Sequence, residues 1–185
     1  MTRVRGIGVL VSGNGTNLQA LIDAGLPIVA VAANVAAAPA LERVAGIGMP
    51  TAVFALGDFP DRDARDAAMA DWLETHGTEL VVCAGYMQLL RPAFLDRFPA
   101  RVLNVHPALL PAFPGAHAVA VALAAGVTRT GATVHLVDEG LDTGAVLRQE
   151  AVAVLPGDTP ETLHARIRVV EHRLLPEVVR ELITA

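Results

Sequence analysis

Short apolar runs of strand length alternate with helical stretches along this sequence, and this alternation constrains the fold more than any other feature. Strands are expected over residues 4–11, 28–33, 51–56, 80–84 and 101–105. Helices are expected over residues 16–24 and 61–76, and in an alanine-rich segment that ends near residue 46. Because continuous apolar strands between helices are buried on both faces, the pattern predicts a Rossmann-like, doubly wound α/β fold with a mainly parallel sheet.

The last third of the chain follows a different pattern. Residues 130–137 and 145–155 predict two further strands, which the segment "DEGLDTG" (residues 138–144) joins as a loop or hairpin. They would extend the parallel sheet in antiparallel fashion near the C-terminus. A final helix is expected to start near Thr159. The length of 185 residues suits one core, so we expect a single domain over residues 1–185.

Composition excludes several functional classes. The net charge of −5 argues against a protein that mainly binds nucleic acid. All 14 basic residues are arginine, which excludes a lysine Schiff base and a Walker lysine. No uninterrupted apolar stretch reaches the length of about 18 residues that a membrane span needs. Cys83 is the only cysteine and is expected to be a buried, inert thiol. We therefore expect a cytoplasmic protein without a membrane partner.

A glycine-rich segment, "LVSGNGTNLQ" (residues 10–19), connects the first strand to the first helix. Thr16 and Gln19 fit a capping box at the helix start. A dinucleotide site is disfavoured because Leu18 stands where the fingerprint needs a third glycine, and Asn34 stands where an acidic residue is needed after the second strand. A site for one phosphate group needs less, and Gly15, Thr16 and Asn17 could supply it. An ordinary glycine turn is the alternative.

The segment "NVHPALLPAFPG" (residues 104–115) begins at the end of the fifth strand. Residues two apart in a strand project to one face, so Asn104 and His106 should point together at the carboxyl edge of the sheet, where ligands bind in such folds. Pro107 should end the strand. An amide can donate to a developing oxyanion, and Asp142 beside the imidazole would favour its protonated form. These residues suit attack on a carbonyl or formyl carbon by a substrate group.

Structural roles remain alternatives for the same residues. His106 could cap the strand, and Asp142, between two glycines, could be a turn residue. A metal site of two histidines and one carboxylate is a third alternative, with His106, His135 and Asp142 as ligands. Neither histidine, however, has the short-range spacing of a strong metal motif.

Three motifs together resemble the phosphoribosylglycinamide formyltransferase family, the folate-dependent enzymes of purine synthesis: "SGNGTNLQ", "NVHPALLPAFPG" and "GATVHLVDEGLDTG". The resemblance runs from residue 4 to about residue 182. It implies transfer of a formyl group from 10-formyltetrahydrofolate, as co-substrate, to the amine of glycinamide ribonucleotide. It implies one formyltransferase domain whose N-terminal half binds the phosphate and nucleotide part and whose C-terminal half binds folate and carries catalysis. No metal is expected, and a homodimer is left open.

The resemblance also assigns roles to individual residues. It implies that the catalytic residues are Asn104, His106 and Asp142. It implies that glycinamide ribonucleotide contacts Gly15, Thr16, Asn17, Arg168, Val169, Val170 and Glu171. Arg168 and Glu171, three apart on a helix, would share a face, although an ordinary surface pair is the alternative.

The implied folate pocket comprises Arg62, Met87, Gln88, Leu89, Leu90, Asn104, Asp138, Glu139, Gly140, Leu141 and Asp142. Gln88 is a departure, because arginine is often found there in the family. Two other formyl-folate enzymes share the central motifs. Methionyl-tRNA formyltransferase is a longer enzyme with an additional RNA-binding domain. Formyltetrahydrofolate hydrolase uses water as the acceptor and usually carries a separate N-terminal regulatory domain. A non-catalytic nucleotide-binding module is the alternative from outside the enzymes.

Overall fold

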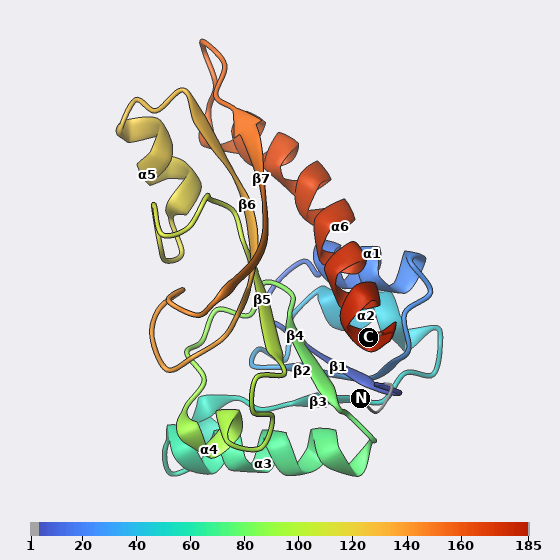
Figure 1. The fold of residues 1–185 in the computed structure, drawn as a ribbon. Helices are drawn as coiled ribbons and strands as arrows, with labels where there is room; N and C mark the ends of the chain where they lie inside the picture. Colours follow the sequence, from blue (N-terminus) through green and yellow to red (C-terminus); the bar gives the residue numbers. More distant parts are fainter. Residues whose placement is uncertain (1–3, 185) are drawn as a thin grey trace.

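The computed structural model describes residues 4–184 and contains one seven-stranded sheet in the order β3-β2-β1-β4-β5-β6-β7. The strands are β1 (Ile7–Val11), β2 (Ile28–Ala33), β3 (Thr51–Val53), β4 (Leu80–Cys83), β5 (Val102–His106), β6 (Arg129–Leu136) and β7 (Val146–Ala153). The first five are parallel, whereas β6 runs antiparallel to β5 and β7 antiparallel to β6 (Figure 1). The predicted fold class is confirmed.

Helices cover both faces of the parallel part of the sheet (Figure 1). The helices within residues 4–184 are α1 (Thr16–Asp23), α2 (Ala40–Ala45), α3 (Arg62–Thr75), α4 (Pro92–Leu95), α5 (Ala118–Ala124) and α6 (Pro160–Thr184), with a 3₁₀ turn η1 (Leu56–Asp58). No helix within residues 4–184 is both long and apolar enough to cross a membrane.

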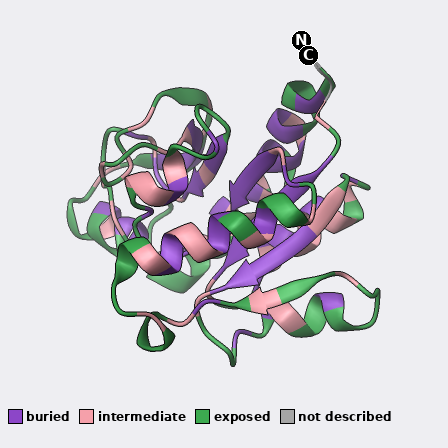
Figure 2. Cartoon of the chain, turned by 90° about the horizontal axis from the view of Figure 1, so that it is seen from below, coloured by how far each residue is buried: buried purple, intermediate pink, exposed green. Residues whose placement is uncertain are grey.

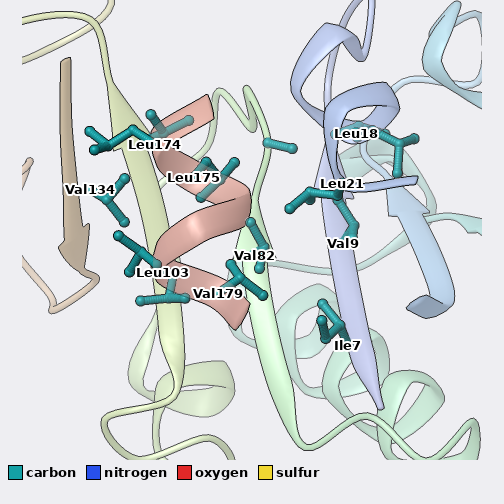
Figure 3. Packing of buried hydrophobic residues seen from close by; sticks show 14 of the residues in the cluster. Ile7, Val9, Leu18, Leu21, Val82, Leu103, Val134, Leu174, Leu175 and Val179 are labelled. Carbon is teal, nitrogen blue, oxygen red and sulfur yellow. The ribbon is translucent and has the colours of Figure 1, made fainter. Parts of the chain in front are cut away.

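Two apolar clusters explain why the strands are continuously apolar. Alternate residues of one strand enter different clusters: Val9 packs with α1 and α6, whereas Leu10 packs with α3. Figure 3 shows the first cluster, in which Leu174 and Val179 of α6 lie against the sheet. Figure 2 shows the result, with buried strands inside and helices exposed on their outer sides. A strand buried on both faces needs apolar residues at every position.

The expected elements and the observed ones differ in several places: β1, for example, begins at Ile7, whereas a strand is expected from residue 4. The expected strand 51–56 is shorter, because β3 ends at Val53 and η1 follows. The short helices α4 and α5 were not predicted. The predicted capping box is wrong: Gly15 is the N-cap of α1 and no side chain caps the helix. Gln19 instead donates to Asp23 and accepts from Arg43.

Candidate active site

A cavity of 470 Å³ lies at the carboxyl ends of β1, β4 and β5, which is where open α/β sheets bind ligands. Its walls come from the loop after β1, the loop after β4, the end of β5, the β6–β7 connection and one side of α6. The parallel strands thus deliver segments far apart in sequence to one place.

Asn104 and His106 both reach this cavity from β5, as the strand periodicity predicts. His135 lies directly across from Asn104 in the register of β5 and β6. The Asn104 Nδ2 atom is 3.2 Å from His135 Nε2 and 3.4 Å from Asp142 Oδ1. The other ring nitrogen of His135 lies 2.7 Å from the Leu136 carbonyl oxygen, and this contact holds the ring with Nε2 toward the cavity.

Asp142 connects the groups on β5 and β6. Its backbone has φ of 55°, the left-handed region that non-glycine residues rarely adopt, and the loop thereby turns its carboxylate inward. The Oδ2 atom accepts from the Gly115 N–H at 2.8 Å and lies 3.3 Å from His106 Nδ1. Burial raises the pKa of Asp142, but the contacts with His135, Gly115 and His106 outweigh it and leave that pKa below its ordinary value. Asp142 is therefore ionised at neutral pH.

Both ring nitrogens of His106 face oxygen acceptors. The Nε2 atom is 2.8 Å from the Phe113 carbonyl oxygen, and Nδ1 faces the Asp142 carboxylate. A carbonyl oxygen can only accept, so Nε2 carries a hydrogen in this arrangement. A ring with hydrogens on both nitrogens satisfies both contacts. To donate from Nε2 to a ligand, His106 must exchange its bond with Phe113.

The loop after β1 is held in place by α2. An added Cβ at Gly15, whose φ is 67°, would lie 2.5 Å from the Ala40 side chain, so only glycine fits there. The Arg43 Nε atom donates to the Asn14 carbonyl oxygen at 2.6 Å. Gly15, Thr16 and Asn17 line the cavity where α1 begins. The free N–H groups of a helix start favour an anion.

One side of α6 faces this loop. His164, Arg168 and Glu171 line the cavity, and Asn17 Nδ2 donates to Glu171 Oε2 at 3.2 Å. Val169 and Val170, the other two residues expected there, do not line it, and Val169 is 71% exposed. Arg168 and Glu171 thus share the face that the helical spacing predicts.

The stability of the protein should depend on pH through Glu171. Burial raises its pKa from 4.5 to about 7, although the bond from Asn17 and the charge of Arg168 oppose this. The folded state then binds more protons than the unfolded state between these values, so stability falls as pH rises through that window. We expect Glu171→Gln to remove a difference on the order of 2 kcal/mol between unfolding free energies at about pH 5 and pH 8. Denaturant titrations at both pH values measure it, and an unchanged pH dependence in the variant would contradict the assignment.

An apolar wall lines the cavity beside the loop after β1. Met87, Leu89 and Leu141 remain 63%, 44% and 51% exposed, and Gln88 and Leu90 of the same segment as Met87 also line the cavity. Asp138 and Gly140 also line the cavity. Glu139 and Arg62 do not: Arg62 is exposed at the first position of α3.

Ser12 joins the loop after β1 to this wall. Its hydroxyl donates to Asn34 Oδ1 at 2.6 Å and accepts from the Met87 N–H at 2.8 Å. One small side chain therefore ties together the segments that follow β1, β2 and β4.

Several residues that line the cavity are not among those predicted from the sequence to bind a substrate or act in catalysis, namely Ser12, Tyr86, Gly115, His135 and His164. The sequence pattern suggests His135 only as a metal ligand, whereas the antiparallel register of β5 and β6 places it opposite Asn104. Within residues 4–184, no three His, Cys, Asp or Glu side chains form a group that could hold a metal ion. Cys83 is buried, as expected, and burial raises the pKa of its thiol to about 12.

Comparison with known proteins identifies the class to which this fold and cavity belong. Residues 5–179 match the formyl transferase family (Formyl_trans_N). The chain therefore belongs to the formyl transferase family.

Individual proteins and solved structures are also similar to this chain over most of its length. Phosphoribosylglycinamide formyltransferase of Mycobacterium tuberculosis is 52% identical over 180 residues, which are 95% of this chain and 84% of that protein. The crystal structure of glycinamide ribonucleotide transformylase 1 from Symbiobacterium toebii superposes with a TM-score of 0.95 at 45% identity, over 98% of this chain and 88% of that one. The trifunctional purine biosynthetic protein adenosine-3 of Drosophila pseudoobscura is 45% identical over 94% of this chain and 13% of its own length.

Proposed function

We propose that this chain transfers the formyl group of 10-formyltetrahydrofolate to the amine of glycinamide ribonucleotide, a step of purine biosynthesis. The observation that carries the proposal is that Asn104, His106 and Asp142 meet in a cavity that is also lined by the start of α1 and by an apolar wall, in a member of the formyl transferase family. We take residues 1–185 as one domain, with the ribonucleotide phosphate on the N-terminal half and folate and catalysis on the C-terminal half. We place the reaction in the cytoplasm, without a nucleic-acid partner.

The two substrates would occupy opposite ends of the cavity. The phosphate of glycinamide ribonucleotide would bind the N–H groups of Gly15, Thr16 and Asn17, with Arg168 as the nearby cation. The folate would lie against Met87, Leu89, Leu90 and Leu141. The reacting amine and formyl carbon then meet beside Asn104, and the cavity of 470 Å³ falls in the size range of small-molecule sites.

In the proposed reaction, the neutral amine attacks the formyl carbon and forms a carbon–nitrogen bond. The Asn104 amide donates to the oxygen that becomes negative, and the His106 side chain, held by Asp142, supplies positive charge nearby. The tetrahedral intermediate collapses by breaking the bond between the formyl carbon and the folate nitrogen. The amine loses one proton and the folate nitrogen gains one, so no net proton is taken up. The Asp142 carboxylate and adjacent water would relay the proton from the amine to the folate nitrogen.

Asp142→Asn should lower kcat by about 10²-fold. The variant keeps the shape of the side chain but loses the negative charge that stabilises a protonated His106. Circular dichroism and thermal unfolding check that the fold survives, and steady-state kinetics with both substrates measure the loss. Near-wild-type turnover in a folded variant would show that the carboxylate charge does not take part.

Acceptor choice separates this proposal from its alternatives. The purified protein is incubated with 10-formyltetrahydrofolate and, in parallel, with glycinamide ribonucleotide, with initiator methionyl-tRNA or with water alone. Formyl transfer only to glycinamide ribonucleotide is the expected result. Release of formate without an acceptor would indicate a hydrolase, formylation of the tRNA would indicate a tRNA-directed enzyme, and no consumption of the folate would indicate a binding module.

A further inference from the structure

A charged pair lies buried beneath the apolar wall of the cavity, and the proposed mechanism does not use it. Arg65 and Asp66, adjacent on α3, are both 0% exposed. The Arg65 Nε and Nη2 atoms donate to Asp66 Oδ1 at 2.8 and 2.6 Å. Burying two charges is expensive even when they are paired, so the presence of such a pair is weak evidence that it serves stability.

The remaining contacts of this pair lead to the segment that forms the wall. Asp66 Oδ2 accepts from the Arg91 N–H at 2.7 Å, just beyond the residues that line the cavity. Arg65 Nη1 lies 3.5 Å from the side-chain oxygen of Gln88, which is half-buried and lines the cavity. Asp66 thus fixes one end of the segment, and Arg65 contacts its polar side chain.

A glutamine amide can present either its oxygen or its NH₂ group to a ligand. Arg65 has only donors, so the oxygen of Gln88 turns toward the guanidinium and the NH₂ group is left for the cavity. At 3.5 Å the contact is long, but a buried full charge still orients the amide dipole. The wall therefore offers a hydrogen-bond donor at this point.

We propose that Arg65, paired with Asp66, is a positioning residue that makes Gln88 a donor to an acceptor oxygen of the folate, a carbonyl or a carboxylate. This inference rests on the proposed function, because it concerns the folate side of the same cavity. Gln88 would touch the folate directly, whereas Arg65 acts through Gln88.

Two substitutions of Gln88 test whether its NH₂ group faces the folate, without changing Arg65. Gln88→Glu keeps an oxygen toward Arg65 but replaces the donor with a second acceptor, so KM for 10-formyltetrahydrofolate should rise by about 10-fold or more. Gln88→Met removes the amide and should raise that KM by about 5-fold. The KM for glycinamide ribonucleotide and kcat should change less than about twofold. An unchanged folate KM in Gln88→Glu would overturn the proposal, because it would mean that the NH₂ group does not face the ligand.

A double-mutant cycle tests the role of Arg65. The variant Arg65→Met/Asp66→Asn removes both buried charges together and keeps an amide oxygen for the Arg91 N–H. It should raise the folate KM by about 3–5-fold. Combined with Gln88→Met, it should add little, because both changes abolish the same donor. Independent, multiplying effects would overturn the positioning role, and if the double variant does not fold, the Gln88→Glu result decides the orientation.

Failure of the proposed function can be distinguished from failure of the inference about Arg65 and Gln88. If the unmodified protein does not transfer formyl groups to glycinamide ribonucleotide, no KM can be measured, and the proposed function is wrong. If it does so and only the Gln88 and Arg65 results differ from expectation, the inference alone is wrong.

Discussion

Asn104→Ala is expected to lower kcat for formyl transfer by about 10²–10³-fold, the usual loss when one oxyanion donor is removed. In this chain the amide lies beside both His135 and Asp142, so its donor is held in place before substrate binds. Removing it leaves the developing negative charge without that hydrogen bond, while the KM values for both substrates should change little.

The measurement is steady-state kinetics on protein whose thermal unfolding matches that of the unmodified chain. Gln19→Ala is a matched control, since it removes an amide from α1 that does not line the cavity. The control should retain near-normal kcat. Comparable losses in both variants, or no loss in Asn104→Ala, would show that Asn104 has no special role in the transition state.

Asp66→Ala is expected to lower the free energy of unfolding by about 3–5 kcal/mol, because it leaves the fully buried Arg65 guanidinium without its counter-charge. It also removes the acceptor of the Arg91 N–H. Chemical denaturation followed by circular dichroism measures the change. Replacing both charges, as in Arg65→Met/Asp66→Asn, should be less harmful than this single change.

Asp63→Ala is the matched control for this prediction. Asp63 lies on the same helix and pairs with Arg91 at 3.1 Å, but its side chain is 62% exposed. An exposed pair contributes about 0–1 kcal/mol, so the control should unfold almost as the unmodified protein does. Equal losses for Asp63→Ala and Asp66→Ala would mean that burial of the Arg65–Asp66 pair does not matter for stability.

The elements of the fold that the sequence predicts are those with strong local signals. Continuous apolar runs identified the parallel strands, since burial on both faces leaves no polar position. The short helix α5, "AVAVALA", was missed because small apolar residues carry no clear helical or strand period. The capping box failed because Gly15 packs directly on Ala40, a tertiary contact that the local motif does not contain.

Strand periodicity and sequence motifs predict only part of the candidate site. The shared direction of Asn104 and His106 follows from their spacing of two. The bonds from Gly115 to Asp142 and from His106 to Phe113 use backbone groups, which every residue possesses and no sequence pattern marks. Arg65 and Asp66 look like ordinary polar residues of a charged helix, and only the tertiary fold, which brings Gln88 and Arg91 against them, shows that they are buried.

The position of Ser12 has a consequence for anyone who redesigns this protein. Its single hydroxyl touches both the segment that follows β2 and the backbone of the segment that carries Met87. Under the proposed placement of the substrates, changes intended to alter the selectivity for one of them would therefore be transmitted to the segment proposed to bind the other. Mutant libraries that randomise the loop after β1 and the apolar wall separately would miss combinations of substitutions that work only together. The two segments should therefore be varied in one library.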